Sequence, residues 1–237
     1  LAPTRSTLYD LQTTHLLTVP FENLDIHLKR PLSMKEGDLF MKIVTRRRGG
    51  FCYELNGLFA ALLRALGFEV TLLSARCINA DDSLSPEYDH LALLVQAPDD
   101  PDRYLADVGY GDFAIEPLSL AVTGWQLQGD QAFKLDRTGE FLKVFRREHD
   151  GHIEPQYVFK LQAREFDEFT DMFHYHQTSP ESSFTRRRIC SLATLTGRIT
   201  LSDLNFIVTD QHVKTECLLS GEDEYRSVLH DKFGIEL

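Results

Sequence analysis

The pattern of apolar residues changes at Gly67, and this change constrains the fold more than any other feature of the sequence. Ahead of it, apolar residues recur at helical spacing from Leu55 to Leu66, which predicts a helix of about 14 residues that ends at Gly67. Behind it, short strand-like runs alternate with polar or Gly-containing turns as far as residue 162, which is typical of a small antiparallel barrel or sandwich. The expected strands are 68–77, 89–97, 103–108, 115–120, 132–136, 140–146 and 156–162.

The segments on either side of this β-rich part contain helices. We expect helices at 6–18 and 36–46, the second with Leu39, Phe40, Ile43 and Val44 facing inward, and a turn at 21–24 between them. After a helix at 164–174, strands near 188–195, 198–201, 204–209 and 212–219 precede a last helix at 222–233. The sequence therefore predicts an α+β fold with a helical domain at 1–67, a β-barrel domain at 68–163, and an interdomain helix with an α/β lid at 164–237.

Cys52 occupies a position that suits a nucleophile. It follows Arg46–Arg48 and the Gly49-Gly50 pair, and it lies at the start of the helix that ends at Gly67. Unpaired backbone N–H groups at a helix start favour the thiolate over the thiol. The glycines allow a sharp turn and a close approach. We expect one of the arginines to pair with Glu54 and hold this loop.

A base and its orienting carboxylate are found downstream. His90 enters the strand 89–97, and Asp107 ends the strand 103–108 just before a glycine-rich turn. Adjacent antiparallel strands would place the two side chains together, facing the start of the Cys52 helix. Cys, His and Asp in that order are the groups of a thiolate–imidazolium–carboxylate relay.

Several blocks of the sequence resemble the signature blocks of the arylamine N-acetyltransferases. They are RRRGGFCYELN, DHLALLV and LADVGYGD, with VPFENL upstream and YHQTSPESSF downstream, in that order. The resemblance runs from about residue 19 to residue 184. Members of that family usually carry a further helix ahead of the segment that starts here at Leu1. Either this form is truncated or its first residues lie outside this sequence, and the absence of that helix would affect stability more than chemistry.

The resemblance implies a papain- or transglutaminase-like Cys-His-Asp core and a two-step acetyl transfer. Acetyl-CoA would acetylate Cys52, and an arylamine, arylhydrazine or hydrazide would then take the acetyl group. Glu22 and Asn23 would brace the first domain. Arg186–Arg188 would meet CoA phosphates or, equally, form a solvated turn or a lid brace. The implied site residues are Cys52, His90 and Asp107 for catalysis, Phe21 and Tyr110 for the acceptor pocket, and Tyr175, Thr178 and Ser179 for CoA.

Composition limits the other partners. A net charge of −11 argues against a general nucleic-acid binder. The four cysteines form no CxxC spacing, which favours reduced thiols in the cytoplasm. No apolar run approaches the roughly 18 residues that a membrane span needs. His174 and His176 would share a side of an extended segment, but no third ligand stands at a recognisable spacing, so we expect no metal. We expect a monomer or a homodimer.

Two other activities use the same catalytic groups. A thiol hydrolase or peptidase shares the triad order, although an aromatic-walled small pocket argues against a groove for a peptide chain. An amide synthase of the same family, acting on polyketide thioesters, has the same catalytic blocks, and the sequence does not separate it from an acetyltransferase.

Overall fold

The computed structural model describes residues 1–237 as an α+β chain that forms two compact units. The barrel unit contains Leu1–Thr13, Phe59–Val108 and Phe113–Thr170, and the cysteine unit contains Thr14–Leu58, Gly109–Asp112 and Asp171–Leu237. Each unit therefore combines stretches that are distant in the sequence. Helices α1 (Arg5–Thr18) and α4 (Cys52–Leu66) each begin in one unit and end in the other.

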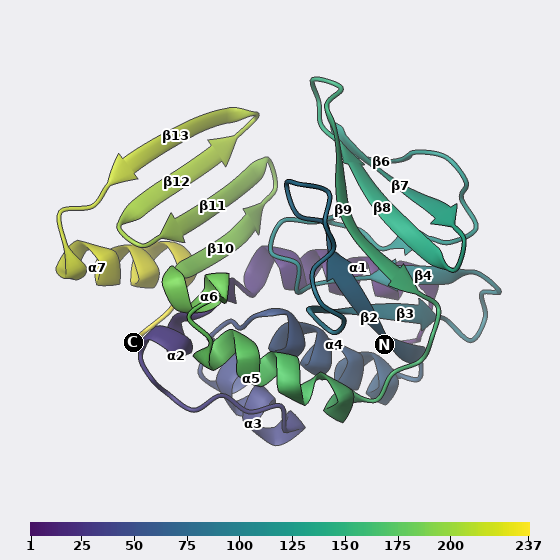
Figure 1. The fold of residues 1–237 in the computed structure, drawn as a ribbon, viewed down its shortest axis with the longest axis horizontal. Helices are drawn as coiled ribbons and strands as arrows, with labels where there is room; N and C mark the ends of the chain where they lie inside the picture. Colours follow the sequence, from purple (N-terminus) through teal and green to yellow (C-terminus); the bar gives the residue numbers. More distant parts are fainter. The chain divides into compact units, whose positions relative to one another are not determined.

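The barrel unit holds an eight-stranded antiparallel sheet in the order β5-β4-β3-β2-β9-β8-β7-β6 (Figure 1). Its end strands are joined by Gln126, whose side chain accepts from the Ser119 N–H at 2.8 Å and donates to the Ser119 carbonyl at 3.0 Å. The sheet is thus a nearly closed barrel. The strands are β2 (Glu69–Cys77), β3 (His90–Gln96), β4 (Arg103–Ala106), β5 (Leu118–Ser119), β6 (Gln126–Gln128), β7 (Gln131–Thr138), β8 (Phe141–Arg147) and β9 (Ile153–Lys160).

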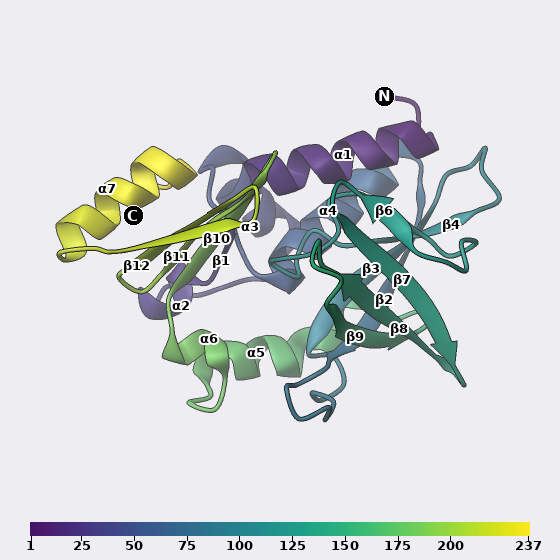
Figure 2. The ribbon, with the colours of Figure 1, turned by 90° about the horizontal axis from the view of Figure 1, so that it is seen from above.

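The cysteine unit holds a five-stranded antiparallel sheet in the order β1-β10-β11-β12-β13, with helix α7 (Glu222–Phe233) packed on one face (Figure 2). Apolar side chains of α7 and of the sheet form a shared core that includes Leu201, Tyr225 and Leu229. All six residues of the edge strand β13 are exposed. The strands are β1 (Phe21–Glu22), β10 (Ile189–Thr194), β11 (Gly197–Ser202), β12 (Asn205–Asp210) and β13 (Val213–Leu218).

Helix α4 carries the apolar stripe that its sequence predicts. Leu55, Phe59 and Leu63 recur four residues apart and are fully or almost fully buried. Gly67 follows with φ +98°, a left-handed conformation that ends the helix. The remaining helices are α2 (Leu24–His27), α3 (Glu36–Phe40), the π-helix η1 (Met41–Thr45), the 3₁₀ helix η2 (Phe166–Phe169), α5 (Thr170–Thr178) and α6 (Ser183–Arg186).

Most of the predicted elements are present, and three predictions fail. Residues 21–24 form strand β1 and the start of α2 instead of a turn. Helix 36–46 continues from α3 into η1, and Phe40 and Val44 are about half exposed. Leu39 and Ile43, four residues apart, are buried, so the inward-facing stripe of this segment is narrower than predicted. His174 and His176 lie on helix α5 and not on an extended segment. The division into three domains stays a prediction.

Candidate active site

Cys52 is the first residue of α4, and the start of that helix is held by its own third residue. The Glu54 carboxylate accepts from the N–H of Phe51, the residue that caps the helix, at 3.2 Å. This is one half of a capping box. The Cys52 side chain is buried, and none of the four cysteines forms a disulfide. Cys52 therefore lies at a helix start, where unpaired backbone N–H groups favour negative charge.

The Gly49-Gly50 pair is needed for close packing within the chain. A Cβ at Gly49 would collide with the carbonyl oxygen of Pro20, and one at Gly50 would lie 2.8 Å from the Glu54 carboxylate. Neither glycine has the positive φ of a left-handed turn. The Glu22 N–H donates to the Gly50 carbonyl at 2.8 Å, which ties this loop to β1. The glycines thus allow other parts of the same chain to pack closely against this loop.

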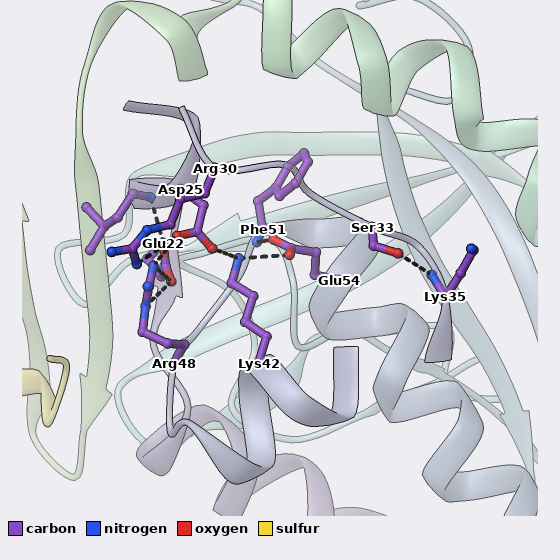
Figure 3. Close-up of polar contacts among 10 residues, drawn as sticks. Glu22, Asp25, Arg30, Ser33, Lys35, Lys42, Arg48, Phe51 and Glu54 are labelled. Atoms are coloured by element: carbon purple, nitrogen blue, oxygen red, sulfur yellow. Dashed lines mark hydrogen bonds and ion pairs between the residues drawn. The ribbon is translucent and has the colours of Figure 1, made fainter. Parts of the chain in front are cut away.

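A network of buried charges lies behind the loop (Figure 3). The Arg48 guanidinium donates to Glu22 through Nε at 3.0 Å and through Nη2 at 2.7 Å, and to Asp25 at 3.1 Å. Lys42 Nζ lies 2.8 Å from Glu54 and 3.0 Å from Asp25. The prediction that an arginine pairs with Glu54 is therefore wrong, because the partner is Lys42 on η1.

Burial and charge act on the acids of this network in opposite directions. Burial raises the pKa of Glu54 to about 7, although the charge of Lys42 opposes the shift. Burial also acts to raise the pKa of Asp25, but the charges of Lys42 and Arg48 outweigh it, so that pKa lies below its usual value. The network therefore holds Asp25 ionised and leaves Glu54 able to titrate near neutrality.

His90 and Asp107 form a buried pair in the barrel unit. Strand β3 begins at His90 and pairs antiparallel with β4, which ends one residue before Asp107. His90 Nε2 lies 2.7 Å from Asp107 Oδ2. The adjacency that the sequence predicts for these two residues is confirmed.

Two further residues hold Asp107 in place, one through its carboxylate and one through its backbone. The Tyr157 hydroxyl donates to Asp107 Oδ2 at 3.0 Å, and the Tyr157 ring lies 5.3 Å from the His90 ring, centroid to centroid. The Gln12 side chain accepts from the Asp107 N–H at 3.2 Å. Sequence reasoning missed both residues, because they come from α1 and β9, and no motif marks them.

The segment 109–112 packs against the start of helix α4 in the cysteine unit. A Cβ at Gly109 would lie 2.7 Å from the Cys52 Cα. A Cβ at Gly111 would lie 3.6 Å from the Phe21 ring. Tyr110 stands between these two contacts and is partly exposed, whereas Phe21 is buried. The chain therefore brings both predicted acceptor-pocket residues into the unit that contains Cys52, and their role in binding stays a prediction.

The residues predicted to bind CoA lie at the end of α5. The Thr178 hydroxyl donates to the His174 carbonyl at 2.8 Å. The Ser179 N–H donates to the Tyr175 carbonyl at 2.9 Å, and the Ser179 carbonyl accepts from Thr185 at 2.6 Å. These bonds close a helix C-terminus. Their role toward CoA stays a prediction.

The arginines that follow this helix make contacts within the cysteine unit. Arg188 makes two hydrogen bonds to Glu222, at 2.9 and 2.8 Å, and its guanidinium lies 4.1 Å from the centroid of the Tyr225 ring. Arg186 donates to the Glu181 carbonyl at 3.1 Å. Arg188 therefore braces α7 against the sheet.

The structure shows neither a cluster of metal ligands nor a helix that could span a membrane. No group of three or more His, Cys, Asp or Glu side chains is arranged to hold a metal ion. None of the helices combines the length and the apolar character that crossing a membrane requires.

Comparison with known proteins places these features in a family. A sequence model described as N-acetyltransferase matches residues 4–237. An arylamine N-acetyltransferase of Mycolicibacterium smegmatis is 32% identical over 239 residues, which cover 99% of this chain and 86% of that protein. Human arylamine N-acetyltransferase 1 is 31% identical over 254 residues, 98% of this chain and 87% of that protein.

Solved structures agree with the sequence matches. The M. smegmatis arylamine N-acetyltransferase superposes with a TM-score of 0.93 at 30% identity, covering 100% of this chain and 88% of that one. The Mycobacterium marinum enzyme, solved in complex with CoA, superposes with a TM-score of 0.91 at 29% identity, covering 99% of this chain and 88% of that one.

Proposed function

Because this chain belongs to the arylamine N-acetyltransferase family, we propose that it transfers the acetyl group of acetyl-CoA to the nitrogen of arylamines, arylhydrazines or hydrazides. The transfer runs in two steps through an acetyl group carried on Cys52. The observation that carries the proposal is the buried His90–Asp107 pair, 2.7 Å apart, in a chain whose only cysteine at a helix start is Cys52.

The members of the proposed triad are connected through the short segment that follows Asp107. Asp107 stands two residues before Gly109, which packs directly on the Cys52 backbone. Asp107 accepts a hydrogen bond from His90 Nε2, so Nδ1 is the nitrogen that exchanges protons with the reacting groups. Tyr157 holds the Asp107 carboxylate, and Gln12 holds the Asp107 backbone N–H.

In the first step His90 Nδ1 accepts the thiol proton, and the Cys52 thiolate attacks the thioester carbonyl carbon. The bond from that carbon to the CoA sulfur breaks, and the CoA thiolate leaves with the proton held by His90. The backbone N–H of Cys52, at a helix start, donates to the oxyanion.

In the second step the amine nitrogen attacks the acetyl carbon on Cys52. His90 accepts the proton that the nitrogen loses, and the carbon–sulfur bond to Cys52 breaks. The products are the N-acetylated amine and a regenerated Cys52 thiol. Arylamines and hydrazides are mostly neutral at pH 7, so the nitrogen lone pair is available to attack. We propose that Phe21 and Tyr110 form the aromatic wall for this flat acceptor, and that Tyr175, Thr178 and Ser179 contact CoA.

Intact-protein mass spectrometry tests the proposal. Wild-type protein mixed with acetyl-CoA and no amine is expected to gain the mass of one acetyl group and to lose it when aniline or isoniazid is added. Cys52→Ala is expected to gain none, whereas the matched control Cys217→Ala, at an exposed cysteine, keeps the adduct. An adduct that persists in Cys52→Ala, or no adduct on wild type, would overturn the proposal. Hydrolysis of peptides without CoA would indicate a thiol peptidase instead.

A further inference from the structure

The charge network of the cysteine unit contains more buried acids than buried bases. Three buried carboxylates, Glu22, Asp25 and Glu54, share the buried Arg48 and the largely buried Lys42, whose side chain is 12% exposed (Figure 3). Burying unpaired charge is costly, so such a set favours the uptake of a proton. A third cation, Arg30, lies 3.7 Å from Asp25 but is about half exposed, so within the buried part of the network the three carboxylates outnumber the cations.

Two acids of the network have additional partners. Glu22 receives two bonds from Arg48 and a third from the Leu24 N–H at 2.6 Å. Asp25 contacts Lys42 and Arg48, and the half-exposed Arg30 lies 3.7 Å from it. Among the side chains of the network Glu54 pairs only with Lys42, which it shares with Asp25.

Glu54 connects three parts of the chain around the nucleophile. Its Oε1 binds Lys42 on η1, and its Oε2 accepts from the Phe51 N–H. It stands two residues after Cys52 in the first turn of α4, and its carboxylate packs against Gly50. A change in this carboxylate is therefore transmitted to the backbone on both sides of the cysteine.

We propose that Glu54 and Lys42 are positioning residues for the Cys52 nucleophile, and that their ion pair fixes the Phe51–Cys52 backbone from which the thiol projects. The effect of this ion pair on acetyl transfer rests on the proposed function, whereas its effect on the placement of the Cys52 thiol does not. Nucleophilic attack depends on placement to a fraction of an ångström, so loosening the first turn slows the reaction without removing any reacting group.

The protonation state of Glu54 sets the strength of its ion pair with Lys42, the anchor of the Phe51–Cys52 backbone. The charged groups that face it are Lys42 from η1, Glu22 from β1, Asp25 from α2 and Arg48 from the loop. Burial, aided by Glu22 and opposed by Lys42, raises its pKa to about 7. A neutral Glu54 leaves Lys42 to Asp25, so the anchor strengthens as the pH rises through that value.

Alkylation of native Cys52 by iodoacetamide, followed by peptide mass mapping across the neutral pH range, tests the inference. The wild-type rate is expected to show a step near pH 7 in addition to the ionisation of the thiol, and Glu54→Gln is expected to lose that step. Glu54→Ala and Lys42→Met are expected to slow alkylation roughly tenfold above this pH. Glu54→Gln is expected to keep the lower rate of neutral Glu54 at every pH and to stay faster than Glu54→Ala, because its amide oxygen still accepts from the Phe51 N–H but carries no charge to pair with Lys42.

The control is Lys160→Met, which breaks the more exposed ion pair with Glu140 and is expected to change neither rate nor profile. If the Glu54 and Lys42 variants lower the melting temperature but keep the wild-type alkylation rate and profile, the ion pair is only structural and the inference is wrong. Alkylation needs no acetyl-CoA, so this result is independent of whether the protein forms an acetyl adduct.

Discussion

Replacing Arg48 by methionine should destabilise the protein more than any single loss of a surface charge. The Arg48 guanidinium is 5% exposed and makes three hydrogen bonds to Glu22 and Asp25. Its removal leaves Glu22, which is fully buried, without the cation that forms its ion pair. Breaking one side of a buried ion pair costs about 3–5 kcal/mol.

Urea unfolding, followed by circular dichroism, measures this loss. The double variant Glu22→Gln/Arg48→Met should regain at least half of it, because the uncompensated charge is gone. The matched control is Lys134→Met, which breaks the partly exposed pair with Asp136 and should cost at most about 1 kcal/mol. If Arg48→Met costs no more than this control, the network contributes no stability and the reasoning is refuted.

Three further outcomes follow from packing and burial. Gly109→Ala should lower the free energy of unfolding in urea by about 1–3 kcal/mol and slow the alkylation of Cys52, because the added Cβ would meet the Cys52 backbone. The control Gly37→Ala, which has nothing within 4 Å of the added Cβ, should be neutral or stabilising. Folding raises the pKa of Glu54 from 4.5 to about 7, so the folded protein holds this proton more tightly than the unfolded chain. The stability gained in this way is fully present below pH 4.5 and is lost as the pH rises through about 7. As the pH rises over this range, the free energy of unfolding of wild type should therefore fall by up to roughly 3 kcal/mol relative to that of Glu54→Gln. Urea unfolding at each pH measures this difference. With a thiol reagent under native conditions, exposed Cys217 should react well before Cys77, since burial, with the Asp89 charge, raises the pKa of the Cys77 thiol.

The parts of the fold that the sequence predicts are those in which side-chain period and burial agree. The helix from Cys52 to Leu66 and the final helix from Glu222 to Phe233 follow an uninterrupted apolar period. The hairpin of β3 and β4 follows from two apolar runs and an acidic, proline-containing turn. From this hairpin the approach of His90 to Asp107 could be predicted without a structure.

The missed features depend on contacts between distant residues. Strand β1 has only two residues, and it forms because β10 supplies its partner. The π-helix interrupts the α-helical period, so no pattern showed that Lys42 turns toward Glu54. Tyr157 reaches Asp107 across 50 positions of sequence. Local propensity carries no information about such pairings.

The glycines around Cys52 have a consequence for mutational scanning of this protein. Gly49, Gly50 and Gly109 each lie so close to another part of the chain that a single added carbon would overlap it. Substitution at these positions should lower the measured activity by reducing the amount of folded protein, although none of the three takes part in any proposed chemical step. A map of inactive variants would therefore overcount the catalytic residues, unless the abundance of folded protein is measured for each variant as well.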